Sequence, residues 1–338
     1  MTPDVSTTES YLYELLDNQD HVLRTLGGVQ PGGLLESSIH ADIRSSASLR
    51  MRLTEEIDWL ARRLRVSYVL NGVTTPLLTG IPAVKDEQAD AAAGVELQVD
   101  LYDKTSILLG DSYGQAYAVP AGANLIAAAI AVIASAGETT IAIPASAATA
   151  ATGLAWPATD SKLRIVNDLL TAAGYLSVWC DALGWYRAEP ATSPADRPIR
   201  FELEPDGDPY LPTVARSYDP YEVPNRVRVL GATDGTTEAP MAEATDERIE
   251  NPFSKLRRGF WRTHPETDVA AADLAGYAAR RLVELQQVYE AHQVTHPWMP
   301  AGLNDAGRFR GRRVVIQKQR QRLSVGGLVT STLRTVIE

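Results

Sequence analysis

Two short stretches near the N-terminus alternate strictly between apolar and polar residues, and this alternation restricts the possible folds more than any other feature of the chain. At the end of Ala41–Leu53 (ADIRSSASLRMRL), leucine and methionine alternate with Arg50 and Arg52. In Leu64–Leu70 (LRVSYVL), every second residue from the first is again apolar. Successive side chains of a strand point to opposite faces. Both stretches are therefore predicted to form strands with one buried face, and the role of the arginine-bearing face needs an explanation.

The first hundred residues have the pattern of an all-β unit. Asn71–Gly72 lies between two apolar runs and predicts a two-residue hairpin turn, because both residues tolerate a positive φ. Gly27–Gly28 and Pro31–Gly33 mark further turns. The expected strands are Tyr11–Leu16, His21–Leu26, Ile39–Leu53, Leu64–Leu70, Pro76–Val84 and Val95–Tyr102.

Residues 104–190 have a different character. Helical periodicity predicts helices over Asn124–Ala136 and Asp160–Ala173. In the second helix, Asp160 or Ser161 can cap the start and Gly174 ends it. Two short predicted strands, YLSVWCD and GWYRAEP, follow. This part of the chain is predicted to be a small α+β module.

The last third begins with a proline-rich stretch, residues 191–224, which predicts a connector of short extended pieces that returns to the N-terminal domain. From Asn225 a second mostly-β unit is expected, with one long helix over Thr267–Tyr289. The strands expected in it are NRVRVLG, EAHQVTHPWMP, GRRVVIQKQRQRL and LVTSTLRTVIE. The predicted class is α+β, mainly β, with domains 1–103, 104–190, 191–224 and 225–338.

Composition indicates a globular protein, with 45% apolar and 22% charged residues in 338. The net charge is −10, although residues 248–338 hold 15 Lys/Arg and only 8 Asp/Glu. The acidic remainder argues against a sequence-reading nucleic-acid binder. The apolar run Ala121–Gly137 is too short for a bilayer span. The N-terminus MTPDVSTTES has no signal-peptide pattern, and the single cysteine permits no intramolecular disulfide.

One motif suggests a hydrolase. Gly110–Gly114 (GDSYG) matches the G-x-S-x-G pattern that places a nucleophilic serine, here Ser112, on a turn between a strand and a helix. Pro120 and the glycines near it disfavour a helix directly after this motif, and no alternating βα pattern surrounds it. The motif is therefore interpreted as a chance match.

Other candidate residues also favour structural interpretations. His292 and His296 have the spacing of zinc ligands on a helix, but their alternation with Val294 predicts a strand with solvent-facing histidines. Asp206–Asp208 (DGD) predicts a turn, because the carboxylates of a calcium loop do not follow it. Cys180 is expected to be a small buried apolar residue. Glycine-rich phosphate-binding loops are absent from the sequence.

Taken in order, these segments resemble baseplate or tail-tip hub proteins of long-tailed bacteriophages, often called minor tail proteins in phages of actinobacteria. In the first part the resemblance lies in ELLDNQDHVLRTLGG, ADIRSSASLRMRL and VELQVDLYDKTSILLGD. In the middle it lies in AYAVPAGANLIAAAIAVIASAG and SKLRIVNDLLTAAGYLSVWCDALGWYRAEP, and at the end in PNRVRVLG, ENPFSKLRRG and AADLAGYAARRLVELQQ. One departure is the alanine-rich stretch Ala142–Ala158, which is longer than the family pattern.

The resemblance implies two tube-like antiparallel β-barrel domains that flank the α+β insert, and a ring of three copies whose six barrels match a sixfold tail tube. It implies a structural, non-enzymatic virion protein at the distal end of the tail, around the DNA exit channel. The implied partners are further copies of the chain, the distal tail protein or tail tube, tail fibre or tip proteins, and the tape measure protein. DNA is implied only as transient cargo, and no membrane insertion, cofactor, metal or catalytic residue is expected.

In such a ring, the arginine-bearing strand face has a possible role. We hypothesise that Arg50 and Arg52 lie at a subunit interface or on the outer wall and that the pore is acidic, because each cationic contact would add affinity for DNA phosphates. A lumen lined by Arg50, Arg52, Arg312 or Arg313 would contradict this hypothesis.

Three alternatives remain open at this point. The first is the homologous hub of a phage-derived particle, such as a gene transfer agent or an injection machine. The second is a serine hydrolase that acts through Ser112 on cell-wall or ester substrates. The third is a carbohydrate-binding fibre module, although only 7% of the residues are aromatic.

Overall fold

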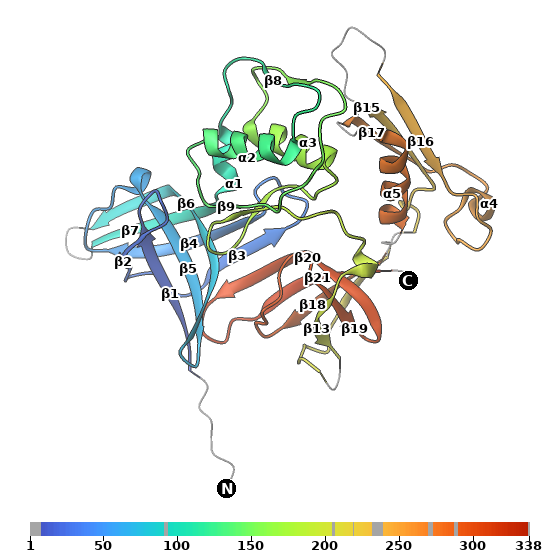
Figure 1. Ribbon diagram of the computed structural model, residues 1–338. Coiled ribbons are helices and arrows are strands. Elements are labelled where there is room, and N and C mark those ends of the chain that lie inside the picture. The colour runs from blue at the N-terminus through green and yellow to red at the C-terminus, as the bar shows by residue number, and fades with distance from the viewer. Residues whose placement is uncertain are drawn as a thin grey trace.

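The structure, a computed structural model, describes residues 8–90, 94–204, 207–218, 220–231, 239–269, 273–286 and 290–336. The described residues are mainly β-structure, and one sheet of thirteen strands dominates them. Two smaller units lie beside this sheet (Figure 1). No described helix is long and apolar enough to cross a membrane.

The first half of the large sheet comes from the N-terminal part of the chain. Its strands lie in the order β3-β4-β7-β6-β5-β1-β2, and all neighbours are antiparallel. A 3-10 turn, η1 (Trp59–Ala61), precedes β5. The strands are β1 (Glu9–Leu16), β2 (Val22–Thr25), β3 (Gly33–Ser38), β4 (Ser45–Leu53), β5 (Arg63–Leu70), β6 (Val73–Asp90) and β7 (Gly94–Asp103).

The alternation seen in the sequence is confirmed in β4. Leu49, Met51 and Leu53 are buried in the core of this half, whereas Arg50 and Arg52 are exposed. These residues form a strand because every second side chain is then buried in the apolar core, while the side chains between them face outward.

The predicted hairpin between β5 and β6 is also confirmed. Leu70 pairs with Val73, so that Asn71 and Gly72 form a two-residue turn. Their φ angles are 50° and 81°, in the left-handed region that this turn requires.

The predicted single strand Ile39–Leu53 is wrong in its first part. The chain forms β3, which was not predicted, and then a loop before β4 starts at Ser45. The loop is closed by a hydrogen bond from the amide of Ser38 to the carbonyl of Arg44, 2.8 Å long. The carboxylate of Asp103 accepts from the amide of Ser45 at 2.7 Å. The loop between β3 and β4 is polar, and apolar–polar alternation therefore does not predict where the strands end there.

The second half of the sheet comes mostly from the C-terminal part of the chain. It contains β18 (Glu290–His296), β19 (Ala306–Phe309), β20 (Arg312–Leu323) and β21 (Val329–Thr335), with β13 (Ile199–Leu203) and β14 (Ala215–Tyr218) from the proline-rich stretch. β20 joins the two halves, because it pairs with both β21 and β3. The described strands form no closed barrel, so the two tube-like barrels stay a prediction.

The insert lies on one side of the large sheet (Figure 1) and has its own core. Its two predicted helices are confirmed, and they pack against each other. Asn124 caps α2 by accepting from the amide of Ala127, and Ser161 caps α3 in the same way. The elements are α1 (Thr105–Gly110), β8 (Tyr117–Val119), α2 (Leu125–Ser135), β9 (Ile141–Ala142), β10 (Leu154–Trp156), α3 (Lys162–Ala172), β11 (Trp179–Cys180) and β12 (Tyr186–Arg187).

A third unit carries its own small sheet, in the order β16-β15-β17. Helix α5 packs on this sheet through Ala278 and Leu282, which contact the buried side chains of Val227 and Val229. A short helix, α4, lies between β16 and β17. The elements are β15 (Arg226–Gly231), β16 (Met241–Thr245), α4 (Lys255–Arg258), β17 (Thr263–Val269) and α5 (Leu274–Gln286).

The predicted helix Thr267–Tyr289 is wrong at its start. Thr267 to Val269 belong to β17, which pairs in parallel with β15, and α5 begins only at Leu274. Tyr289 lies outside the described residues. Thr267 is a good cap residue, but pairing with β15 keeps the chain extended there.

The pairing of the strands shows which sheet each part of residues 191–224 and 225–338 joins. β13 and β14 pair with β19 and β18, that is, with the C-terminal strands. The described residues between 226 and 286 form the third unit, whereas β18 to β21 join the large sheet. The division into four domains stays a prediction.

Candidate functional sites

Four buried charged side chains join the insert to the first half of the sheet. Lys104 Nζ lies 2.7 Å from Asp20 Oδ2 and 2.6 Å from Glu138 Oε2. Arg63 contacts the same two carboxylates, at 2.8 Å from Asp20 and 2.6 Å from Glu138. None of the four side chains is more than 9% exposed. We call this set the buried ion network.

The buried ion network is balanced in charge and in hydrogen bonds. Two cations face two carboxylates, and Lys104 donates its remaining bond to Thr140 at 2.9 Å. For Arg63, burial disfavours the charged form, but the hydrogen bond with Asp20 and the charge of Glu138 outweigh it, so the pKa of Arg63 is raised. The network holds the chain after α2 against the β1–β2 turn and β5, which fixes where the insert sits.

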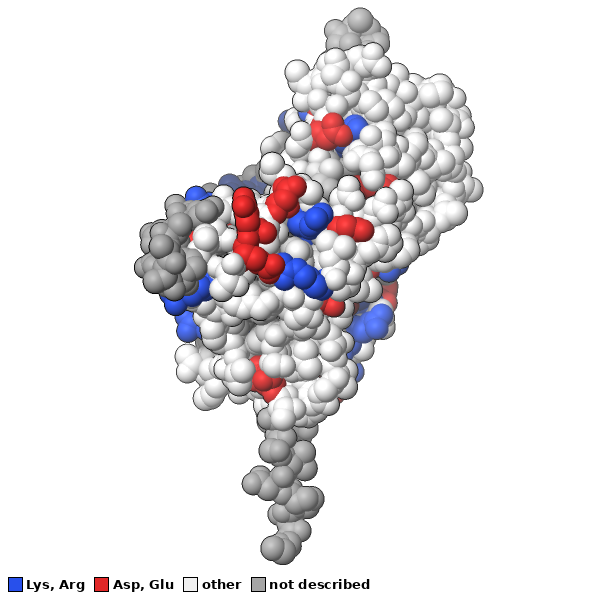
Figure 2. All heavy atoms as spheres, turned by 90° about the vertical axis from the view of Figure 1, so that its left-hand side faces the viewer, with Lys and Arg blue, Asp and Glu red and all other residues white. Residues whose placement is uncertain are grey.

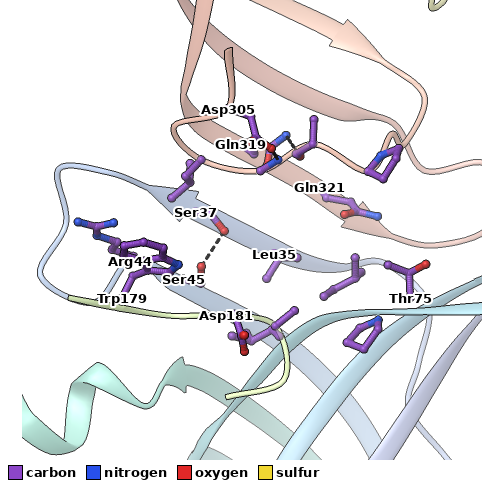
Figure 3. Close-up of a pocket in the computed structure, with 18 of the residues that line it drawn as sticks. Leu35, Ser37, Arg44, Ser45, Thr75, Trp179, Asp181, Asp305, Gln319 and Gln321 are labelled. Atoms are coloured by element: carbon purple, nitrogen blue, oxygen red, sulfur yellow. Dashed lines mark hydrogen bonds between the residues drawn. The ribbon is translucent and has the colours of Figure 1, made fainter. Parts of the chain in front are cut away.

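A cavity of about 520 Å³ opens where β3 and β4, the β11–β12 hairpin and the loop after β18 meet (Figure 3). Its lining is mixed. The Ser37 and Ser45 hydroxyls lie 2.9 Å apart, and the Arg44 guanidinium lies 5.6 Å from the ring centre of Trp179. Leu35, Thr75, Asp181, Asp305, Gln319 and Gln321 line other parts of it.

Cys180 also lines this cavity. Burial raises the pKa of the Cys180 thiol well above its usual range, which disfavours the thiolate that a nucleophile needs. Cys180 is half-buried, in partial agreement with the predicted buried residue.

Ser112 lies after a helix and not before one. α1 ends at Gly110, Ser112 forms an isolated bridge with Ser161, and the next element is the short strand β8. A nucleophile elbow needs a strand, then the serine, then a helix. That turn is not formed around Ser112.

His292 and His296 both lie on β18, as the alternation predicts. The prediction that both face solvent is wrong, because His296 is 1% exposed and the side chain of His292 is only 12% exposed. Its Nδ1 lies 2.6 Å from the carbonyl oxygen of Pro297 and its Nε2 lies 2.8 Å from the hydroxyl of Ser331. His292 contacts the buried carboxylate of Glu290 at 3.1 Å. The described residues bring no three potential metal ligands together.

Asp208 lies in a turn after β13, where its amide donates to the carbonyl of Glu202 at 2.8 Å. This agrees with the predicted turn, but Asp206 lies outside the described residues.

Most arginines that the sequence singled out have partners within the chain. Arg52 contacts Glu96 across β4 and β7 at 3.1 Å, and Arg312 contacts Glu290 at 2.9 Å. Arg313 donates to the carbonyl of Arg197 at 2.6 Å. Arg50 is exposed. Figure 2 shows the face on the left of Figure 1, where acidic and basic side chains lie next to one another. This face has no field of a single sign.

The comparisons with known proteins address the whole fold. No family model and no curated protein sequence matches the chain. Solved structures do match, among them the following three. The 43 kDa tail protein of prophage MuSo2 from Shewanella oneidensis is 14% identical with a TM-score of 0.62, and the match covers 97% of this chain and 98% of that one. The tail protein from Neisseria meningitidis MC58 is 11% identical with a TM-score of 0.61, over 97% of this chain and 96% of that one.

The third structure is the E. coli c3393 protein, 8% identical with a TM-score of 0.52, over 99% of this chain and 76% of that one. It is described as a component of the type VI secretion system with structural similarity to the T4 bacteriophage tail proteins gp27 and gp5. The chain has the fold of phage tail proteins. The resemblance found in the sequence is confirmed at this level.

Proposed function

We propose that the chain is a structural component of a phage tail, the trimeric hub at the distal end that joins the tail tube or distal tail ring to the tip or receptor-binding apparatus. The observation that carries the proposal is the match of nearly the full length to two tail proteins, with 97% of this chain covered in both. A match over one shared domain would support far less, because many functions share a fold. The protein is then a virion component without enzymatic activity.

In the proposed ring, the two halves of the large sheet serve as the two tube-like domains. The main strand order of the sheet ends at β2 and at β14, and each of these strands has one paired edge among the described strands. An open edge can pair with another chain. Head-to-tail contacts between such edges close into a ring when the rotation fits, here by threefold symmetry.

The further partners in this proposal are the distal tail protein, the tail fibre or tip proteins and the tape measure protein, with DNA passing through the channel. We place Arg50 and Arg52 at an interface or on the outer wall. The pairing of Arg52 with Glu96 supports this placement, because a neutralised arginine does not need a phosphate as its partner. A structure of the ring with Arg50, Arg52, Arg312 or Arg313 in the lumen would contradict it.

Electron microscopy of the purified chain at micromolar concentration, together with mass photometry, tests the proposal. We expect a threefold ring with the mass of three chains and a central hole. A chain that remains a monomer, and also remains one after mixing with the distal tail protein encoded beside it, would contradict the hub.

A second candidate is the equivalent hub of a phage-derived particle, such as an injection machine or gene transfer agent. The similarity to a type VI secretion component favours it. The genes next to this one distinguish the two. The hydrolase alternative is tested separately by an ester-substrate assay of the wild type and Ser112→Ala. Activity that is present in the wild type and lost in the variant would support a hydrolase.

A further inference from the structure

A second cavity, of about 320 Å³, lies where all the units meet. It is bounded by the β3–β4 loop, the chain after α3, the proline-rich stretch, α5 and strands β20 and β21. These segments are far apart in the sequence, and no sequence motif marks them.

The lining of this cavity is strongly cationic. Arg44, Arg197, Arg281 and Arg334 all line it, whereas Glu284 is the one carboxylate among its lining residues. We call these four residues the arginine cluster. His40 also faces the cavity.

Three members of the arginine cluster donate to neutral carbonyls. Arg44 donates to Ser177 at 3.1 Å, Arg197 to Asn304 at 2.8 Å, and Arg334 to Glu284 at 3.3 Å, in each case to the backbone oxygen. Among the described residues, none of the three has a carboxylate within 4 Å (the two salt bridges formed there both involve Arg281). The Nε of Arg334 is buried and has no hydrogen-bond partner. An unsatisfied buried donor of this kind is costly.

Arg281 differs from the other three because it is already engaged. It contacts Glu266 at 2.5 Å and Glu284 at 3.1 Å. The single lining carboxylate is therefore used by Arg281, and the charge of the other three arginines is not compensated at contact distance.

The electrostatic consequence appears in the pKa values. Burial, followed by repulsion from Arg281, lowers the pKa of Arg334 to about 10. Burial also lowers the pKa values of Arg44 and Arg197. Placing several like charges in one partly buried space is unfavourable unless an opposite charge joins them.

We propose that this cavity binds a small multivalent oxyanion of the phosphate class, held by Arg44, Arg197 and Arg334. A cavity of about 320 Å³ is ample for a phosphoryl group. Guanidinium groups match the geometry of phosphate oxygens through paired N–H donors. Bound there, the anion ties the β3–β4 loop, the proline-rich stretch and β21 together, and this inference does not depend on the proposed tail function.

The experiment is a titration of the full chain with sodium phosphate, followed by thermal unfolding and by calorimetry, against sodium chloride at equal ionic strength. We expect phosphate to raise the melting temperature and chloride not to, because a ligand bound only by the folded state stabilises it. Equal effects of the two salts would overturn the proposal.

Arg334→Gln is the decisive variant. We expect it to weaken phosphate binding by about 10- to 100-fold, the factor for one hydrogen bond to a charged group. Without phosphate it should unfold at the same or a higher temperature, since it removes an uncompensated charge. The matched control is Arg308→Gln, whose side chain is 59% exposed and outside the cavity. Phosphate binding that is unchanged in Arg334→Gln, or lost equally in Arg308→Gln, would overturn the site.

Glu284→Gln tests the same site with the opposite sign. Removal of the one lining carboxylate should tighten phosphate binding, and weaker binding would count against the proposal. Glycerol phosphate, used in parallel, separates two sources of the anion. Equal affinity with inorganic phosphate indicates recognition of the phosphoryl group alone, and tighter binding of the ester indicates a phosphorylated metabolite. Both results support the site.

Discussion

Lys104 has no exposed side-chain surface, yet it carries a charge that two carboxylates and a hydroxyl satisfy. Burying a charge is unfavourable on its own, and a buried pair is stabilising only when its hydrogen bonds are complete. The buried ion network meets this condition, because Arg63 bridges the same carboxylates from the other side. Its effect is positional: it specifies one docking of the insert on the sheet.

Lys104→Met should therefore destabilise the chain strongly. The variant leaves Asp20 and Glu138 with one cation between them, and breaking a buried pair typically costs about 3–5 kcal/mol. Urea unfolding, monitored by tryptophan fluorescence, measures this change. The control is Arg228→Met, which removes a partly exposed pair with Glu243 and should cost about 1 kcal/mol or less. Similar losses in both variants would show that the network has no special role.

Titration of His296 makes the stability of the fold depend on pH. Burial lowers its pKa from the usual 6.5, and its contacts suit the neutral ring, with Nδ1 donating to Pro297 and Nε2 accepting from Ser331. The stabilising contribution of the neutral His296 ring is fully present above pH 6.5. It decreases as the pH falls below 6.5, because His296 then binds a proton in the unfolded chain but not in the folded chain. Each such group contributes at most about 1.4 kcal/mol per pH unit.

We expect the free energy of unfolding to decrease from pH 7.5 to 5.5, and to decrease less in His296→Gln. Glutamine can make the same two hydrogen bonds but does not titrate. His40 and His292 also have lowered pKa values from burial, so some dependence remains in the variant. Carboxylates with lowered pKa values, such as Glu266, titrate below this window. Equal pH slopes in the two proteins would contradict the assignment.

Single residues show where sequence-based prediction stops. Leu49 and Met51 were predicted to be buried, because a local period reports which face a side chain occupies. The buried ion network and the arginine cluster were not predicted. Their members come from distant segments, for example Asp20 and Glu138, and each alone reads as an ordinary surface charge.

At the scale of elements, turn chemistry and caps were predictable and strand limits were less so. The Asn71–Gly72 turn and the cap at Ser161 depend on a few adjacent residues, and the structure confirms them. β3 and β17 were missed or misassigned because a partner strand, and not local periodicity, makes them extended.

The hairpin turn allows a clean test at this scale. Gly72 has φ of 81° and nothing within 4 Å of an added Cβ, so Gly72→Ala introduces only backbone strain. We expect a loss of about 1–2 kcal/mol, the cost of a left-handed conformation for an L-residue. Gly302 also has open space around it, but no positive φ. Gly302→Ala should therefore be neutral or slightly stabilising in the same urea unfolding assay. A neutral Gly72→Ala would show that the turn can change type.

At the scale of the whole molecule, the sheet leaves its end strands open. All four residues of β2 are exposed, and Val22 and Leu23 are 48% and 49% exposed. Open edges with apolar side chains can pair with another chain, and proteins that stay monomeric protect such edges with short strands, charged side chains, proline or a covering segment. The single chain thus has, at β2, the features of a contact that another subunit would cover in the proposed ring.

Leu23→Lys should abolish ring assembly and leave the chain folded. A charge on an open edge opposes strand pairing, whereas a surface substitution changes stability by only about 0.5 kcal/mol. Mass photometry and urea unfolding of the same preparation separate the two effects. The control is Val325→Lys, because Val325 is 70% exposed in the turn between β20 and β21 and off the sheet edge. Rings that form equally well with Leu23→Lys would place the subunit contact elsewhere. Loss of rings in both variants would indicate a general effect of added charge, and β2 would then have no special part in assembly.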